Sequence, residues 1–283
     1  MVAVEGAVRM SRSRSARRVS AVGQAQSARI HDALISAGKD SYAVDLAVGK
    51  QLIAQANAYQ TAAQVARLFL LRSVRALVAE EKVGLVVELG SGYPCEPNVH
   101  TVAGAAGGAR TLYVDNHPVV SAHGRALLLD NDLVDFIHAD LTDPDPVIAA
   151  IAELTEPDVP VCICLSAVAE FLDDPAAVVK AISTGLPRGS YAALSHVTCD
   201  VHPTMLARAT EIYRDHGIGF HPRTRSEIAA ILAGWDLLPP GLVPAHHWRP
   251  DPGTDRAHAA AQHWTAPCPD TEICCYGAVA KLP

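Results

Sequence analysis

From residue 85 onward, short β-rich runs alternate with helical stretches, and this alternation limits the possible folds more than any other feature. The runs predicted as strands are Leu85–Leu89, Thr111–Asp115, Val134–His138, Pro160–Leu165, Ser190–Ser195 and Ile273–Ala280. Helices are predicted at Asn98–Ala106, Pro118–Leu129, Asp145–Leu154, Asp174–Leu186 and Thr224–Ala233. A helix between two strands is a crossover, which makes the strands parallel and covers both faces of their sheet. The pattern predicts a doubly wound, mostly parallel α/β sheet.

Three further segments complete the predicted organisation. Residues 1–26 carry five arginines and one acid, Glu5, so we expect a flexible arm, with a phosphate-binding or partner-binding tail as the alternative. Residues 27–80 have apolar residues at i, i+3 and i+4 and predict an N-terminal helical cap. Residues 81–283 form the main domain. Within it, residues 239–272 are rich in Pro, His and Ala and predict a long insertion, for which a lid is one role.

Composition narrows the class of partner. Hydrophobic residues make up 49% of the chain and charged residues 19%, which excludes disorder over most of the length. A net charge of −7 argues against nucleic acid, and no apolar stretch approaches the ~20 residues that span a membrane. The seven cysteines lie partly within apolar runs, and no secretory signal opens the sequence, so we expect a cytoplasmic protein that binds a small molecule.

The most informative segment is a glycine turn after the first predicted strand. The strand carries Glu88 and runs into Gly90-Ser91-Gly92, and glycines there let the backbone approach a ligand closely. A dinucleotide fingerprint requires a third glycine at position 95, which is Cys95. Glu88 would also repel a pyrophosphate, whereas it suits a cationic ligand. S-adenosylmethionine is such a ligand, because it carries a sulfonium and an ammonium group and no phosphates.

Two more acids end the next two strands. Asp115 stands 23 residues after Gly92, where a carboxylate can accept hydrogen bonds from both ribose hydroxyls. Asp140 ends the third strand, where an adenine amino group could be recognised. Each acid alone could be a helix cap or an ordinary loop residue. Three acids in register around one glycine turn favour an adenosyl-cofactor site.

Several distinctive segments accompany these acids. They are Ala28–Asp32 with Gly38–Asp40, Arg67, Phe69 and Arg72, Glu88–Pro94 with Asn98–His100, Tyr113–Asn116, His138–Leu141, Gly189–Tyr191, Leu194–His196, Pro240–Val243 and Trp248–Pro250. Across about Ser27 to Leu282, the sequence resembles a bacterial family of S-adenosylmethionine-dependent methyltransferases that was long catalogued as a domain of unknown function. The resemblance implies a class I methyltransferase fold, Rossmann-like, with seven strands, a reversed final hairpin and an N-terminal helical lid.

The resemblance also implies a set of cofactor contacts. The Gly38-Lys39-Asp40 segment would fold over the cofactor, and Lys39 would meet the methionine carboxylate unless it is simply a surface lysine. The residues predicted to bind the cofactor are Lys39, Glu88, Gly90, Ser91, Gly92, Asp115, Asn116, Asp140, Leu141 and Ser166. The sequence departs from the family at Ala37, at Ala169-Glu170 and at His117, where a glycine, a Leu-His pair and an acid are usual. The cofactor side is mostly intact, whereas the substrate side has changed.

Methyl transfer from a sulfonium chiefly requires alignment, and a base is needed only for a protonated acceptor. The predicted catalytic residues are His196, Glu170 and His31, with Tyr93 and His100 as further pocket lining. A structural histidine at 196 and a surface acid at 170 are the alternatives. The histidines at 246, 247, 258 and 263 and Cys268 match zinc-ligand spacing only in part, so no metal is predicted.

Three hypotheses follow. The first is an O-, N- or C-methyltransferase that acts on a small molecule, for example in secondary metabolism. The second is a methyltransferase-like enzyme with another reaction, such as an intramolecular amine displacement or cyclisation, which the changed substrate side suggests. The third is a non-catalytic binding subunit, because a fold does not establish chemistry. A homo-oligomer or a partner protein is compatible with all three.

Overall fold

The computed structural model describes residues 23–128, 131–264 and 273–283. Most of the predicted 1–26 arm, Cys268 and the end of the predicted insertion lie outside these residues. Within the described chain, no helix is both long and apolar enough to cross a membrane.

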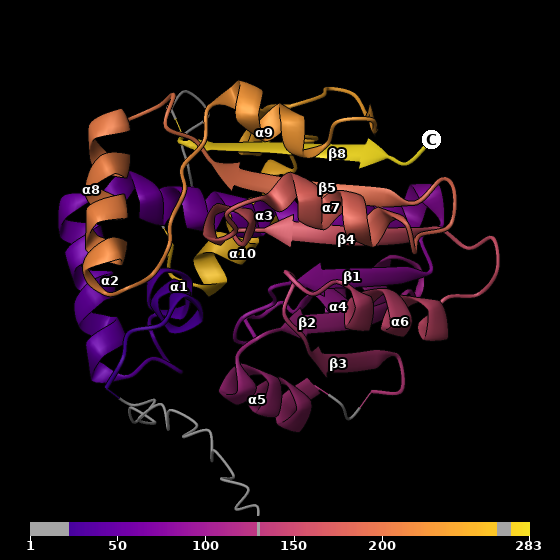
Figure 1. Ribbon diagram of the computed structural model, residues 1–283, viewed down its shortest axis with the longest axis horizontal. Helices are drawn as coiled ribbons and strands as arrows, with labels where there is room; N and C mark the ends of the chain where they lie inside the picture. The colour runs from indigo at the N-terminus through magenta and orange to yellow at the C-terminus, as the bar shows by residue number, and fades with distance from the viewer. Residues whose placement is uncertain (1–22, 129–130, 265–272) are drawn as a thin grey trace, which may run out of the picture.

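A single sheet organises the molecule (Figure 1). Its strands are β1 (Leu85–Leu89), β2 (Arg110–Asp115), β3 (Val134–His138), β4 (Val161–Ser166), β5 (Tyr191–Val197), β6 (Asp236–Leu237), β7 (Val243–Pro244) and β8 (Cys275–Lys281). The order is β3-β2-β1-β4-β5-β8-β6, with β1 to β5 parallel and β8 antiparallel to its neighbours. This mostly parallel, doubly wound sheet with a reversed final strand confirms the predicted Rossmann-like fold.

The sheet has one strand more than the predicted seven. Both β6 and β7 pair with β8, β6 at Lys281 and Ala280 and β7 at Gly277 and Tyr276. Pro239 and Pro240 lie between them. Because proline has no N–H to donate to a strand partner, the edge strand is interrupted and becomes two short strands.

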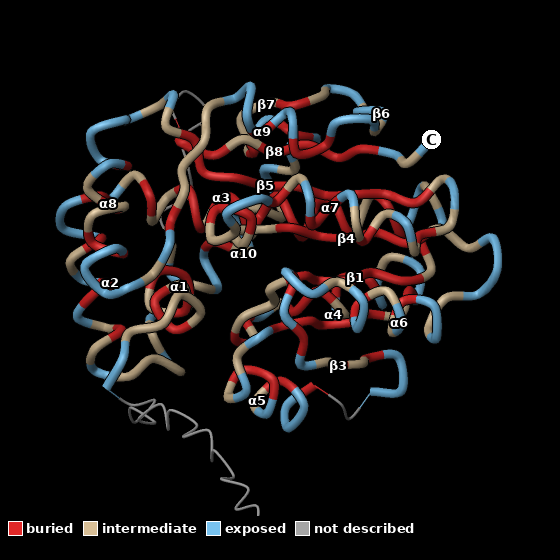
Figure 2. Tube along the Cα trace, in the orientation of Figure 1, coloured by how far each residue is buried: buried red, intermediate tan, exposed pale blue. Residues whose placement is uncertain are grey.

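Helices cover both faces of the sheet. One face packs against α3 (Asn57–Glu81), α4 (Val99–Gly107) and α5 (Pro118–Leu128), and the other against α6 (Asp145–Leu154), α7 (Pro175–Ser183) and α9 (Arg225–Ile231). Neighbouring residues of β1 point to opposite faces, with Val86 in one core and Val87 in the other. Figure 2 shows the central strands buried along their length. The predicted helices are all present.

The N-terminal stretch contains three helices with different surroundings. Helix α1 (Ser27–Ile35) and helix α2 (Ala43–Gln55) lie with α8 (Pro203–Asp215) on the side to which β1 to β5 point (Figure 1). Helix α3 instead packs against β4, β5 and β8. It therefore belongs to the layer that covers the sheet, and of these three helices only α1 and α2 lie past the strand ends.

The described part of the 239–272 segment packs firmly on α3. It contains a short 3₁₀ turn, η2 (Ala245–His247), and α10 (Pro252–Ala261). The Arg72 guanidinium of α3 donates to the carbonyls of Ala245 (2.7 Å) and Trp248 (3.2 Å) and to Asp255 Oδ2 (2.6 Å). Trp248 is fully buried against Phe69. This part of the segment is therefore packed and hydrogen-bonded against α3.

Candidate functional site

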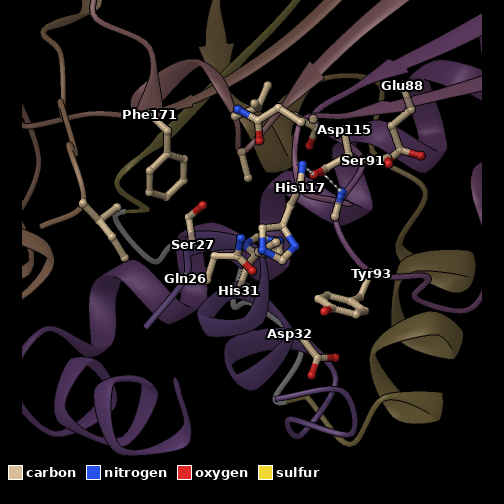
Figure 3. A pocket seen from close by; sticks show the side chains of 18 of the residues that line it. Gln26, Ser27, His31, Asp32, Glu88, Ser91, Tyr93, Asp115, His117 and Phe171 are labelled. Atoms are coloured by element: carbon tan, nitrogen blue, oxygen red, sulfur yellow. Dashed lines mark hydrogen bonds between the residues drawn. The ribbon is translucent and has the colours of Figure 1, made fainter. Parts of the chain in front are cut away.

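A cavity of about 370 Å³ opens at the carboxyl ends of the parallel strands. Ligands of doubly wound sheets bind at this edge. Nine of the ten residues predicted to hold a cofactor line this cavity: Glu88, Gly90, Ser91, Gly92, Asp115, Asn116, Asp140, Leu141 and Ser166. On the opposite side the lining comes from α1 and the residues just before it, including His31 (Figure 3).

The turn after β1 requires glycine at two positions. Gly90 has φ +64°, and a Cβ there would lie 2.2 Å from Val168 Cγ2. Gly92 has φ +62°, and a Cβ there would project into open space. Glycine adopts this left-handed conformation without strain. The turn thus packs closely against the β4 side at Gly90 and leaves free room beside Gly92.

Asp115 is fixed at the end of β2 by backbone donors. Its Oδ2 accepts from Gly92 N and its Oδ1 from His117 N, each at 2.9 Å (Figure 3). Burial raises the pKa of Asp115, and these two hydrogen bonds oppose the rise. Each carboxylate oxygen has a second lone pair. The side chain can therefore accept two more hydrogen bonds from a ligand.

Asp140 lies at the end of β3 and is exposed. Its Oδ1 accepts from Thr142 N (2.9 Å) and Thr142 Oγ1 (2.7 Å), and these bonds lower its pKa. Its Oδ2 accepts from Asn116 Nδ2 at 3.2 Å. The ends of β2 and β3 are thus joined by a side-chain hydrogen bond on the cavity wall.

Glu88 forms an ion pair with Arg67 of α3. Glu88 Oε1 lies 3.2 Å from Arg67 Nη1, and Arg67 Nη2 also donates to the carbonyls of Cys95 (2.6 Å) and Pro97 (2.9 Å). Burial raises the pKa of Glu88 to about 7, and Arg67 opposes the rise. Arg67 thereby fixes both the carboxylate and the loop after the glycine turn.

Two histidines of the lining come from opposite sides of the cavity. Burial, with a contribution from the nearby Arg67 charge, lowers the pKa of His31 to about 4, so this ring is neutral at pH 7. Burial also lowers the pKa of His117. The Nδ1 atoms of both rings are buried without a hydrogen-bond partner in the described chain. Both side chains line the cavity, and each has a ring nitrogen that no described group satisfies.

The structure does not bring His196 or Glu170 to this cavity. His196 is 1% exposed, its Nδ1 donates to Val197 O (2.7 Å) and its Nε2 accepts from Arg223 Nη1 (2.9 Å). Glu170 is 2% exposed, and burial raises its pKa to about 7. Neither side chain can contact a molecule in the cavity without rearrangement. Their role at a reacting centre stays a prediction that this cavity does not support.

Two other predicted residues also lie apart from the cavity, and one joins it. The Lys39 side chain is 52% exposed, and its Nζ lies 3.8 Å from Asp40 Oδ2. His100 Nδ1 lies 2.9 Å from the Tyr113 hydroxyl, and His100 is not part of the lining. Tyr93 does line the cavity and makes an edge contact with His123.

Several lining residues were not predicted from the sequence to form part of the site. His117 follows directly after Asp115-Asn116, which was a usable signal. Phe171 follows Glu170 in the 3₁₀ turn η1 (Ala169–Phe171), and Ile218 lies in the loop after α8. No local pattern marks these two positions, because only the packing of η1 and of that loop brings them to the strand ends.

Comparison with known proteins shows to which family the chain belongs. A sequence model of the S-adenosyl methyltransferase family matches residues 13–283. The chain belongs to that family. A search of the curated proteins finds no match.

Solved structures of this methyltransferase type are similar over nearly the whole chain. A DUF574 family protein of Streptomyces avermitilis is 30% identical with a TM-score of 0.81, and the match covers 92% of this chain and 98% of that one. A candidate methyltransferase of Thermobifida fusca is 28% identical with a TM-score of 0.80, covering 92% and 95%. The plantazolicin methyltransferase BpumL, solved with S-adenosylhomocysteine (SAH), shares the fold at 12% identity and a TM-score of 0.50, covering 90% and 95%.

The residues of this family member fit S-adenosylmethionine, the cofactor of the family. Asp115 keeps hydrogen-bonding capacity for a ribose, and the space beside Gly92 is free of side chains. Among the described residues, four carboxylates and one guanidinium line the cavity, and that guanidinium is already paired with Glu88. The lining therefore favours a positively charged ligand over a phosphate-bearing one.

Proposed function

We propose that this protein transfers a methyl group from S-adenosylmethionine to a small molecule bound between the strand ends and α1. The observation that carries the proposal is the convergence of Glu88, Asp115 and Asp140, from three strands, on one cavity around the Gly90–Gly92 turn. A cavity of about 370 Å³ lies within the range of small-molecule sites, roughly 300–1,000 Å³.

Each acid has a role that its position supports. Asp115 would accept the two ribose hydroxyls with the lone pairs that its backbone donors leave free. Asp140 would accept from the adenine amino group. Glu88 would lie near the positive charge of the methionine moiety, where Arg67 keeps its carboxylate oriented. Lys39 is not among the described lining residues, so its contact with the methionine carboxylate stays a prediction.

The chain's own contribution to chemistry is alignment. When bound, the cofactor supplies an activated methyl group. The protein then has to hold the acceptor in line with that group and exclude water, and such positioning can lower a reaction barrier by about 7–11 kcal/mol. Of the three predicted catalytic residues, His31 alone lines the cavity. We assign it the contact with the acceptor's nucleophile.

Calorimetric titration with SAH tests the cofactor site. We expect binding in the micromolar range and, for Asp115→Ala, at least tenfold weaker binding, because a hydrogen bond to a charged group contributes about 1.5–3 kcal/mol. Asp135→Ala is the matched control, since Asp135 is a half-buried β3 acid paired with Arg110 away from the cavity. No binding of SAH or S-adenosylmethionine by the intact, folded protein would contradict the proposal.

Product analysis separates methyl transfer from the alternatives. Incubation of the protein with S-adenosylmethionine and a panel of acceptors should yield SAH together with a methylated acceptor. Release of methylthioadenosine with the acceptors unmodified would instead identify an intramolecular displacement within the cofactor. Binding without either product across the panel would indicate a subunit that only binds.

A further inference from the structure

The cavity has a second half that lies away from the strand ends. The strand-end half holds the acids assigned above to the cofactor. The other half is lined by α1, α3, η1 and the loop after α8, including Ala28, His31, Ile35, Leu70, Phe171 and Ile218. This part of the wall, which we call the acceptor half, combines these apolar side chains with the polar side chains of Ser27 and Asp32.

The acceptor half offers a ligand no accessible charge among its described residues. Arg67 is the one guanidinium in the described lining, and it is bonded to Glu88, Cys95 O and Pro97 O. Asp32 is 3% exposed, and its Oδ2 is held by Asp40 N and Ser41 Oγ in the α1–α2 connection, both at 2.9 Å, whereas its Oδ1 is buried with no hydrogen-bond partner among the described residues. Because both oxygens are shielded, a charged group placed here would lose its hydration without reaching an accessible counter-ion.

One wall of the acceptor half is a rigid aromatic surface. Figure 3 shows Phe171 facing the α1 side of the cavity. Its ring lies 5.5 Å from the rings of Tyr213 and Phe220, which back it from behind. Aromatic pairs at such distances stabilise each other's orientation. A flat apolar molecule could therefore pack on Phe171 without displacing it.

Arg223 fixes this wall. Its Nη1 donates to Ala169 O (2.9 Å) and its Nη2 to Leu172 O (2.7 Å) and Asp173 O (3.0 Å). His221 N donates to Glu170 O at 2.7 Å. The residues just after the 217–219 loop thus hold η1 in place, and both segments contribute lining residues. The shape of the acceptor half is preformed.

We propose that the acceptor is an uncharged molecule with a flat, apolar body that packs on Phe171 and with one O–H or N–H group that meets His31. This inference rests on the proposed function, because it assigns the strand-end half to the cofactor. It extends that function by naming the class of acceptor.

The reaction balances with these groups. A lone pair of the acceptor oxygen or nitrogen forms the bond to the methyl carbon, and the electron pair of the broken carbon–sulfur bond goes to sulfur, which changes from sulfonium to thioether. The acceptor's proton passes to His31 and then to water. A weakly basic imidazole suffices, because the heteroatom becomes acidic as the new bond forms.

Three ligands with one ring and different charges test the inference: 4-ethylphenol (neutral), tyramine (cationic) and 3-(4-hydroxyphenyl)propionate (anionic). Each is titrated by ligand-observed NMR into protein saturated with SAH. We expect 4-ethylphenol to bind at least tenfold more tightly than either charged probe. Equal or tighter binding of a charged probe overturns the inference, and so does binding of none of them while SAH is bound. Failure of SAH itself to bind would instead contradict the proposed function.

A variant locates the binding. Phe171→Ala should weaken 4-ethylphenol binding at least fivefold and leave SAH affinity unchanged. Leu237→Ala, on the exposed strand β6, is the control and should alter neither. If Phe171→Ala does not fold, Phe171→Leu keeps the volume and removes the ring face, and it should show the same loss. Unchanged binding of 4-ethylphenol in a folded Phe171 variant would place the probe elsewhere and overturn the assignment.

Discussion

At the scale of single residues, the ion pair between Glu88 and Arg67 couples the cavity to pH. Burial raises the pKa of Glu88 to about 7, so in the empty protein near neutral pH a fraction of the molecules carries a proton there. A cationic ligand favours the ionised carboxylate. Its binding therefore displaces that proton when the pH lies below about 7, and needs to displace none above it.

We predict that S-adenosylmethionine binds about tenfold more weakly at pH 6 than at pH 8, as expected when one proton with a pKa near 7 is displaced. SAH lacks the sulfonium charge and should show a smaller change. Calorimetric titrations of both compounds at pH 6, 7 and 8 measure how steeply each binding affinity changes with pH, and the two slopes are then compared.

Glu88→Gln should remove most of that difference, whereas Glu153→Gln, an exposed acid of α6, should leave it intact. Identical pH slopes for the two compounds in the unmodified protein would show that Glu88 does not sense the sulfonium.

Gly90 gives a second prediction at this scale. Gly90→Ala would place a Cβ 2.2 Å from Val168 Cγ2 in a backbone with φ +64°. We expect the free energy of unfolding to fall by about 2 kcal/mol or more, since left-handed strain alone costs about 1–3 kcal/mol. Urea unfolding measures the change.

Gly104→Ala in α4 is the matched control. A Cβ there meets no atom within 4 Å, and alanine favours a helix over glycine, so stability should rise by about 0.5–1 kcal/mol. A Gly90→Ala variant as stable as the unmodified protein would mean that the turn is not held as described.

The sequence predicted the position of a site residue correctly where that residue lies at the end of a strand. Glu88, Asp115 and Asp140 reach the cavity because each lies at or within two residues of the carboxyl end of a parallel strand. His196 is not part of the described lining: its strand was predicted to stop at Ser195, but β5 continues to Val197 and pairs His196 with Tyr276. For Glu170, the η1 turn directs Phe171 to the cavity and the acid inward. Neither outcome is visible without the partner strand or the turn.

At the scale of elements, α3 holds two parts of the chain together that are far apart in sequence. Arg72 is 4% exposed and binds two carbonyls and Asp255 of the 239–264 segment. We predict that Arg72→Met lowers the free energy of unfolding by about 3 kcal/mol or more, because it leaves buried acceptors without a donor. Chemical denaturation provides the measurement.

Arg75 offers a control on the same helix. Its pair with Asp251 is 37% and 44% exposed, so Arg75→Met should cost less than about 1 kcal/mol. If both variants lost the same stability, the buried network around Arg72 would not be the cause.

Elements were predictable where alternation or periodicity is strong. The predicted bounds of β1, β3 and α6 agree with the structure. Helix α8 was not predicted, although Leu206, Ala209, Ile212 and Tyr213 form a buried helical stripe. Helix α10 carries a single buried apolar residue, Ala259, so it shows little periodicity. Arg72 of α3 binds Asp255 of α10, and a contact between segments so far apart in sequence leaves no pattern in the local sequence.

At the scale of the whole molecule, the cavity joins the N-terminal helices to the strand ends. A ligand that contacts α1 and β1 to β4 together stabilises them as one unit. We predict that SAH at 100 times its dissociation constant raises the melting temperature by about 5 °C or more, from the roughly 2.7 kcal/mol that mass action supplies. Differential scanning calorimetry measures the shift.

Asp115→Ala should reduce this shift at the same SAH concentration, and Asp135→Ala should not. A melting temperature that does not respond to saturating SAH would show that the ligand does not engage the folded state as proposed.

The position of β8 has a consequence for how the chain is made on the ribosome. β8 lies between β5 and the short strands β6 and β7, yet it follows all of them in sequence. While the polypeptide emerges, residues 236–244 leave the exit tunnel before the strand that will receive their hydrogen bonds exists. During that interval β5 also exposes an unpaired edge, which other nascent chains could join. Completion of this sheet therefore waits for β8, the last of its strands in sequence.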